Sequence, residues 1–123
     1  MMALMSVRLG SNNVEKAGAF YDSTFKTIGF GDIRMPTSSG VALYALPGDP
    51  YLITRSAYAG EAATPANGGT IGFAAPDAAA VDRWHATGLT SGGTCEGARG
   101  TRAAAGGRYG AYLRDPDGNK LCA

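Results

Sequence analysis

The chain has 123 residues with 11 basic and 10 acidic side chains, and its formal net charge is +1. This length fits one compact domain, residues 1–123, and such a domain buries roughly two thirds of the surface that its unfolded chain exposes. The charges are spread along the chain without a basic stripe or an acidic tail, so we expect no nucleic-acid partner.

No apolar run approaches the ~20 residues that a membrane-spanning helix needs. The start of the chain, MMALMSVRLG, shows no charged leader followed by a long apolar stretch. We therefore expect a cytoplasmic protein with no membrane partner. Cys95 and Cys122 fit a reducing compartment as free thiols, and we do not expect a disulfide between them.

The first half of the chain predicts a strand, a helix and three further strands. Residues 5–9 alternate between apolar and polar side chains, and the apolar side chains of residues 14–28 fall on one helical face. Asn12 or Asn13 can cap this helix, and Gly29 can end it. Strand candidates follow in the segments GFGDIRM, GVALYAL and PYLITR. We assign residues 5–56 to this first module.

The same order of elements returns about 64 residues later, which indicates an internal repeat. TIGFAA predicts a strand, Pro76-Asp77 a helix start and AAAVDRWHATGL a helix, and strand candidates follow in GTCEG, RYGAYLR and NKLCA. The segment DPDGN predicts the turn between the last two strands. We assign residues 68–123 to a second module of the same βαβββ order. The predicted fold class is α+β, a curved mixed sheet with helices on its outer face and a concave cleft on the other.

Glycine is concentrated near the end of the chain, where eight of the 19 glycines lie between Gly88 and Gly110. This composition predicts a mobile loop with at most one short strand. Long loops in compact domains often act as lids, so the segment is either a surface connection or a flap over the cleft.

Three segments occur in order at the repeat spacing: RLGSNNVEKAGAFYDSTFKTIGF, GGTIGFAAPDAAAVDRWHATGL and GRYGAYLRDPDGNKL. Together they resemble the first strand and helix, the second strand and helix, and the final hairpin of the vicinal oxygen chelate superfamily. Its members include glyoxalase I, extradiol dioxygenases, fosfomycin-resistance enzymes and bleomycin-resistance proteins. The resemblance covers nearly the whole chain and implies paired βαβββ modules, a homodimer, and a small molecule or a metal ion in the cleft.

Metal-dependent members of that superfamily commonly carry a His on the first strand, a second ligand, often His, on the fifth, and a Glu on the last. Matched by position, these places hold Ser6, Thr70 and Cys122, and strand alternation turns all three toward the cleft. Hydroxyl groups and one thiol are poor ligands for a hard or borderline divalent ion. We therefore predict vacant ligand positions, no metal and no other cofactor. His85, the only histidine, is expected to be a partly buried helix residue beside Trp84.

The predicted function is that of a metal-free protein of the bleomycin-resistance type, which binds a small aromatic or amphipathic molecule in the cleft. Aromatic faces and guanidinium groups suit such a ligand, and the candidate contacts are Arg8, Tyr44, Tyr112 and Arg114. One alternative is a lyase or dioxygenase-type enzyme that depends on a metal or on a thiol, with Cys122 as the candidate nucleophile. Another is a dimeric module with a vestigial cleft.

Overall fold

Both halves of the chain contain a strand, a helix and three strands, in that order. The structure is a computed structural model and describes residues 3–48, 50–55, 61–102 and 106–123. The first half contains β1 (Ser6–Gly10), α1 (Val14–Thr27), β2 (Arg34–Met35), β3 (Val41–Ala45) and β4 (Tyr51–Arg55). The second contains β5 (Ile71–Gly72), α2 (Ala78–Thr90), β6 (Thr94–Arg102), β7 (Arg108–Arg114) and β8 (Lys120–Cys122). The predicted α+β class is confirmed, while residue 56, the predicted end of the first module, lies outside the described residues.

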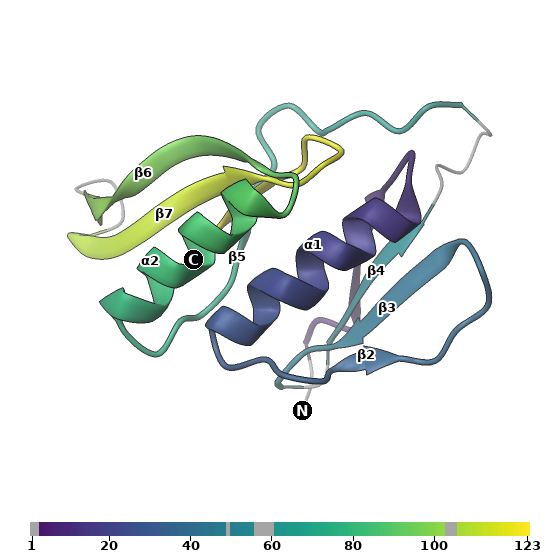
Figure 1. The fold of residues 1–123 in the computed structure, drawn as a ribbon, viewed down its shortest axis with the longest axis horizontal. Coiled ribbons are helices and arrows are strands. Elements are labelled where there is room, and N and C mark those ends of the chain that lie inside the picture. Colours follow the sequence, from purple (N-terminus) through teal and green to yellow (C-terminus); the bar gives the residue numbers. More distant parts are fainter. Residues whose placement is uncertain (1–2, 49, 56–60, 103–105) are drawn as a thin grey trace.

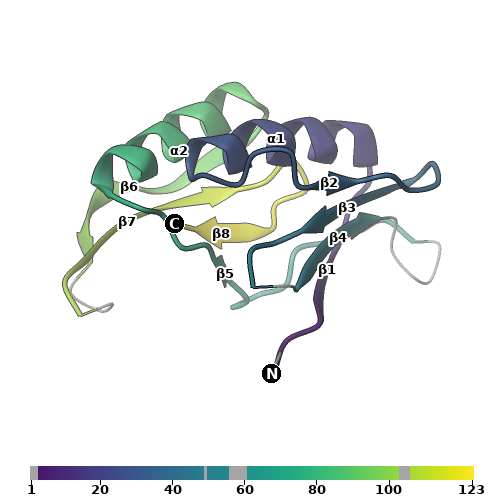
Figure 2. The same cartoon turned by 90° about the horizontal axis from the view of Figure 1, so that it is seen from below.

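The strands form two mixed sheets of the same design. The strand orders are β1-β4-β3-β2 and β5-β8-β7-β6, with the first pair of each sheet parallel and the others antiparallel. Helices α1 and α2 lie side by side on one side of the sheets (Figures 1 and 2). The face of each sheet that is turned away from the helices is called its open face below. Neither helix is long and apolar enough to cross a bilayer, within the part of the chain that the structure describes.

Local sequence signals explain where both helices begin. The side chain of Asn13 accepts a hydrogen bond from the Lys16 backbone N–H at 3.1 Å, and the side chain of Asp77 accepts one from Ala80 at 2.8 Å. Each cap satisfies one of the backbone donors that a helix start leaves unpaired. Of the two caps that the sequence offers for α1 the structure uses Asn13, and the predicted start of α2 at Asp77 is confirmed.

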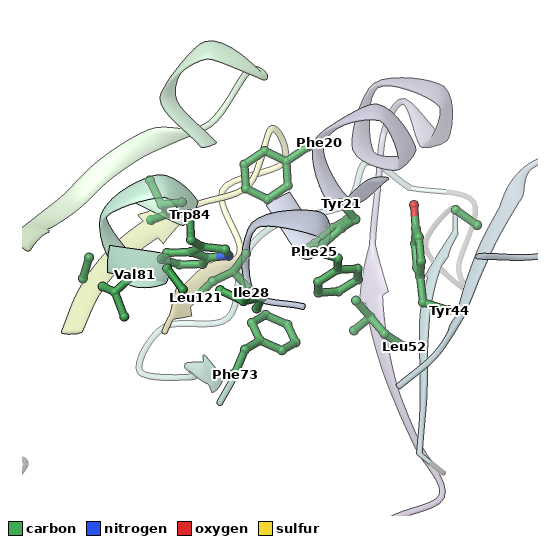
Figure 3. Close-up of a cluster of buried hydrophobic side chains, with 14 residues drawn as sticks. Phe20, Tyr21, Phe25, Ile28, Tyr44, Leu52, Phe73, Val81, Trp84 and Leu121 are labelled. Carbon is green, nitrogen blue, oxygen red and sulfur yellow. The ribbon is translucent and has the colours of Figure 1, made fainter. Parts of the chain in front are cut away.

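One hydrophobic core joins the two halves (Figure 3). Side chains of α1 lie between those of α2 and those of the first sheet, and Phe25 packs edge-on against Phe73 with ring centroids 5.2 Å apart. The fully buried large side chains come from both halves: Phe20, Tyr21, Phe25, Tyr44, Leu52, Trp84, Leu113 and Leu121. Because the aromatic side chains of α1 belong to this shared core, the two halves stabilise each other.

The turn between β7 and β8 also binds the first half of the chain. The buried Asp115 carboxylate accepts a hydrogen bond from the Tyr21 hydroxyl of α1 at 2.6 Å. In the same turn, Asp117 accepts from the Asn12 backbone N–H at 2.8 Å and Asn119 donates to the Gly10 carbonyl at 3.2 Å. The DPDGN segment therefore serves both as a hairpin turn and as a joint between the modules.

The glycine-rich segment is more ordered than the sequence predicts. Residues 94–102 form β6, an antiparallel partner of β7, so the strand predicted in GTCEG is confirmed and continues to residue 102, where a loop was expected. The pairing register shifts between Cys95 and Gly97 and again between Gly97 and Gly100, because β6 has extra residues there that β7 does not match, as in a β-bulge. Residues 103–105 lie outside the described residues, and the flap reading stays a prediction.

Candidate functional site

The two faces of the second sheet differ because side chains alternate along its strands. On β7, Ala111 and Leu113 are fully buried toward the helices, and on β8 Leu121 is buried in the same way. The alternate residues Tyr112, Arg114, Lys120 and Cys122 therefore lie on the open face, as strand parity predicts. This places two of the predicted ligand contacts, Tyr112 and Arg114, in one sheet.

Tyr112 stands in the middle of a row of residues that have small side chains. It pairs with Cys122 on one side and with Gly97 on the other, and Cys122 in turn pairs with Gly72. A Cβ atom at Gly97 would lie 3.2 Å from the Tyr112 ring, and one at Gly72 would lie 3.2 Å from the Cys122 sulfur. Because both positions lack a side chain, the ring and the thiol have room around them on the open face.

Two cations flank the ring of Tyr112. The Arg102 guanidinium carbon lies 5.4 Å from the ring centroid, and the Lys120 ammonium nitrogen lies 5.2 Å from it. Both distances fall within the range of cation–π contacts. Arg102 also donates a hydrogen bond to the carbonyl of Ala98, which fixes its guanidinium group. The site therefore presents an aromatic face between two positive charges.

Arg114 is engaged in internal contacts. Its guanidinium group forms an ion pair with Glu96 at 2.9 Å and donates to the Gly118 carbonyl at 2.8 Å. The hydrogen bond from Arg114 also lowers the pKa of Glu96 below its ordinary value. Arg114 thus braces β6 and the β7–β8 turn, and its charge is largely matched by Glu96.

A hollow of about 660 Å³ lies over this part of the second sheet. Tyr112, Cys122, Arg102 and Arg108 contribute to its lining, which continues past Phe73 to the start of α2. A second hollow of about 460 Å³ adjoins Thr70, Arg114 and Lys120. Small-molecule sites commonly occupy about 300–1,000 Å³ and combine apolar walls with a few polar groups, and the first hollow has that character.

A wider hollow, about 860 Å³, lies elsewhere, between residues 11–15 and residues 34–41. It is more open to solvent than the hollow at Tyr112 and is lined mainly by small polar side chains. Its one basic residue, Arg34, is held in an ion pair with Asp22 at 2.8 Å. Volume alone would favour this groove, but the aromatic ring and the cations gather over the second sheet. We therefore take the Tyr112 hollow as the candidate site.

The positions that match the superfamily's metal ligands carry side chains that suit a metal ion poorly. Ser6 lies in the first sheet and Cys122 in the second, and the residue paired next to Cys122 in β5 is Gly72, whereas Thr70 lies just before that strand. Within the described part of the chain, no three His, Cys, Asp or Glu side chains are grouped as metal ligands. Two hydroxyls and a thiol are a poor donor set for the ions that imidazole and carboxylate groups hold. The residues present do not fit such an ion.

Cys122 is also poorly suited to act as a nucleophile. Burial raises the pKa of its thiol, and the nearby charge of Lys120 opposes that shift only in part. A thiol must lose its proton before it attacks, so a raised pKa lowers its reactivity at neutral pH. Cys122 therefore contributes a neutral sulfur to the floor of the site.

The remaining two predicted contacts lie elsewhere. Arg8 lies on β1 of the first sheet, where it pairs with position 53 of β4. Tyr44 is only 1 % exposed and faces α1, where its hydroxyl lies 3.0 Å from the Gly18 carbonyl and 2.9 Å from an Asp22 carboxylate oxygen, the two acceptors within reach of its single proton. The prediction that Tyr44 contacts a ligand on the open face is therefore wrong, because on β3 the residues Ala42 and Tyr44 alternate inward.

Sequence reasoning did not identify Arg102 as part of the site. It belongs to the end of β6, beyond the segment GTCEG that was expected to form a strand. The repeat itself held a usable signal, because β2 occupies the corresponding place in the first module and pairs with β3, the strand that follows it. His85 is a half-buried residue of α2 next to the buried Trp84, as predicted.

Comparison with known proteins gives a consistent result. The family model described as Glyoxalase/Bleomycin resistance protein/Dioxygenase superfamily matches residues 3–123. A crystal structure of a glyoxalase/bleomycin resistance protein from Albidiferax ferrireducens is 39% identical, with a TM-score of 0.86 over 98% of this chain and 96% of that one. No curated protein matches the sequence.

Two further crystal structures share the fold at lower identity. A glyoxalase-related enzyme from Fulvimarina pelagi is 18% identical, with a TM-score of 0.80 over 99% of this chain and 86% of that one. A lactoylglutathione lyase from Agrobacterium tumefaciens is 23% identical, with a TM-score of 0.68 over 99% of this chain and 92% of that one. At these identities the likeness concerns the fold alone.

Proposed function

Because the chain belongs to the glyoxalase/bleomycin resistance protein/dioxygenase superfamily, we propose that it binds a small aromatic or amphipathic anion, without a metal ion, on the open face of its second sheet. The observation that supports this proposal most is the Tyr112 ring between the Arg102 and Lys120 charges, at 5.4 and 5.2 Å. The proposed ligand stacks on or beside this ring.

The ligand's charge is inferred from the side chains around the ring. Arg102 and Arg108 line the hollow, and Lys120 flanks the ring from β8. A carboxylate or phenolate can accept hydrogen bonds from these groups, and guanidinium donors are well matched to a planar carboxylate. Glu96, the acidic residue of β6, is paired with Arg114. Asp77, the acidic residue of the lining, accepts a hydrogen bond from the Ala80 N–H as the cap of α2. Arg102, Arg108 and Lys120 therefore outnumber the one side-chain carboxylate that the described residues contribute to the lining of the hollow.

The ligand's shape is inferred from the glycines. Gly72 and Gly97 leave flat backbone on either side of Tyr112 and Cys122. A planar ring can lie against such a floor, whereas a Cβ at either glycine would come within 3.2 Å of the neighbouring side chain. Stacking and apolar contact would provide binding energy, and the cations would orient the acidic group.

The proposal is tested by calorimetric titration with a panel of aromatic carboxylates in the presence of a chelator. The matched pair Tyr112→Phe and Tyr112→Leu separates the ring from the hydroxyl. We expect Tyr112→Phe to bind as the wild type does and Tyr112→Leu to bind roughly fivefold more weakly, since an aromatic contact contributes about 1 kcal/mol beyond its area. Lys120→Gln should weaken binding of the acids and leave binding of the corresponding neutral amides unchanged.

Two results would contradict the proposal. One is the absence of binding by every acid in the panel. The other is binding that Tyr112→Leu and Lys120→Gln both leave unchanged, since the ligand would then occupy another surface. Exposed Lys26 of α1 provides the charge control, because Lys26→Gln removes one positive charge far from the ring.

The proposed partner of the chain is a second copy of itself. The open face of the first sheet carries Met35 and Tyr51, each 41% exposed, and a second copy would cover this apolar surface. Sedimentation should give a dimer for the wild type and a monomer for the double variant Met35→Asp, Tyr51→Asp. A monomeric wild type would contradict this part of the proposal. The proposed location is the cytoplasm, whose reducing conditions suit the free thiols of Cys95 and Cys122.

A further inference from the structure

A thiol and an imidazole lie in contact on the helix side of the second module. The sulfur of Cys95 in β6 lies 3.3 Å from Nε2 of His85 in α2. Cys95 pairs with Leu113, whose side chain is buried toward α2, so the thiol lies on the face of the sheet opposite to Tyr112. The Cys95–His85 pair is therefore separate from the proposed ligand site. Because Cys95 and Cys122 lie on opposite faces of the sheet, they do not form a disulfide with each other.

Charged and titratable groups from three elements surround the imidazole. On α2, Asp82 lies one helical turn before His85, and it accepts a hydrogen bond from the Tyr109 hydroxyl of β7 at 2.5 Å. On β6, Arg99 lies 3.7 Å from the same carboxylate and its side chain is 62% exposed. Cys95 is itself exposed, so a dissolved molecule can reach its sulfur.

The imidazole is available as a proton acceptor at neutral pH. Burial and the positive charge of Arg99 hold the pKa of His85 below its usual 6.5, against the opposing effect of Asp82. A neutral imidazole with its proton on Nδ1 has a free lone pair on Nε2, the atom that faces the thiol. A nucleophile within hydrogen-bond reach of a base, with charged groups around that base, is the arrangement of an activated cysteine.

We propose that His85 acts as a general base for Cys95, and that Cys95 is thereby a modification site for small anionic disulfides. In the reaction the thiol proton passes to Nε2 of His85 while the Cys95 sulfur attacks one sulfur of the disulfide. The disulfide bond breaks, and its electron pair leaves with the other sulfur as a thiolate. The imidazolium then returns the proton to that thiolate or to water. Cys95 is oxidised to a mixed disulfide, and half of the reagent is reduced to a thiol.

The charge of the reagent is inferred from Arg99. Its exposed guanidinium group belongs to the same cluster as the thiol and the imidazole, so it can attract a carboxylate-bearing disulfide. Asp82, the acidic member of the cluster, is engaged by Tyr109 and Arg99 and so repels an incoming anion less than a free carboxylate would.

The test uses dithiobis(nitrobenzoic acid), a dicarboxylate disulfide whose released thiol is coloured. The Cys122→Ser variant retains Cys95 as its only cysteine, because the chain has two. We expect one thiol released per chain, with a rate that levels off around neutral pH, above the pKa of His85, and falls as the imidazole is protonated at lower pH. Adding His85→Gln should slow the reaction at neutral pH by roughly tenfold or more and leave only a steady rise toward alkaline pH.

The matched probes and controls make the outcomes distinct. Arg99→Gln should slow the reaction with the dicarboxylate and leave the neutral reagent dithiodipyridine unaffected, and equal slowing of both would overturn the charge assignment. Equal rates with and without His85 would overturn the base assignment. If His85→Gln fails to fold, as judged by circular dichroism, the pH profile of the Cys122→Ser variant decides alone. A rate that rises through the whole range from acid to alkaline pH would then contradict the proposal.

Discussion

Removing the Tyr21 hydroxyl should weaken the interaction between the two modules while it changes the volume of the buried side chain little. Tyr21 is fully buried in α1, and its hydroxyl donates to the Asp115 carboxylate at 2.6 Å. Asp115, 3% exposed, lies in the turn between β7 and β8 and belongs to the second half of the chain. The substitution Tyr21→Phe therefore deletes one buried bond between the halves and leaves the ring in the core.

The size of the effect follows from what remains around Asp115. Its carboxylate still accepts hydrogen bonds from the backbone N–H groups of Asp117 and Asn119 and from the Asn119 side chain, at 2.9, 2.9 and 3.0 Å. One of four bonds to a buried charge is lost, and such a bond contributes about 1.5–3 kcal/mol. We expect the free energy of unfolding to fall by about 2 kcal/mol, which corresponds to a melting temperature lower by roughly 6–12 °C for a domain of this length.

The free energy of unfolding can be measured by denaturant titration with circular dichroism, and Tyr109→Phe provides a matched control. Tyr109 also bonds a carboxylate, that of Asp82, but at the surface, where water replaces the lost partner. We expect Tyr109→Phe to leave the unfolding free energy near that of the wild type. A loss for Tyr21→Phe no larger than the loss for Tyr109→Phe would refute the role of the Asp115 joint.

Three further predictions concern stability. Burial and the Asp115 carboxylate raise the pKa of Tyr21 well above 10.0 in the folded protein, so the hydroxyl loses its proton in the unfolded chain first. The free energy of unfolding should therefore fall as the pH rises above 10.0, and it should fall less steeply in the Tyr21→Phe variant than in the wild type. Gly88→Ala should destabilise by about 1–2 kcal/mol, because the new Cβ would lie 2.3 Å from the buried Leu113 side chain, whereas Gly31→Ala meets no atom within 4 Å and should be tolerated. Thr54→Val should stabilise by roughly 1 kcal/mol, because it replaces a buried hydroxyl that has no hydrogen-bond partner. Thermal and denaturant unfolding check all three, and a sign opposite to that expected would contradict each.

The helices and the final hairpin could be predicted from local chemistry. Asn13 and Asp77 each cap a helix through a side chain that reaches only three residues along the chain, so a short window of sequence contains the whole signal. Strand β7 was predicted with its observed bounds, because apolar Ala111 and Leu113 alternate with polar neighbours. These features do not depend on distant parts of the molecule.

The errors arose where distant contacts decide the structure. Strand β6 contains little apolar periodicity, and its pairing with β7 makes it a strand in spite of Gly97 and Gly100. Tyr44 was expected to be an exposed aromatic contact, yet β3 turns it toward α1, where Gly18 and Asp22 provide hydrogen-bond acceptors for its hydroxyl. Neither partner can be identified from the residues next to Tyr44 in the sequence.

The candidate site was predicted in part. The strand parity that places Tyr112 and Cys122 on the open face could be read from the alternation of β7 and β8. The cation–π contact of Arg102 could not, since it depends on the bulges of β6 that bring residue 102 over the ring. The joint between Asp115 and Tyr21 was also unforeseen, because it connects residues 94 positions apart.

The proposal that this superfamily member binds an aromatic anion without a metal is tested most directly by one comparison. The affinity for an aromatic carboxylate is measured by calorimetry on the untagged protein before and after dialysis against a chelator, with the metal content determined by elemental analysis. We predict the same affinity in both samples, and we predict that neither sample contains a metal ion at a stoichiometric ratio to the protein. A stoichiometric metal ion whose removal abolishes binding would contradict the account.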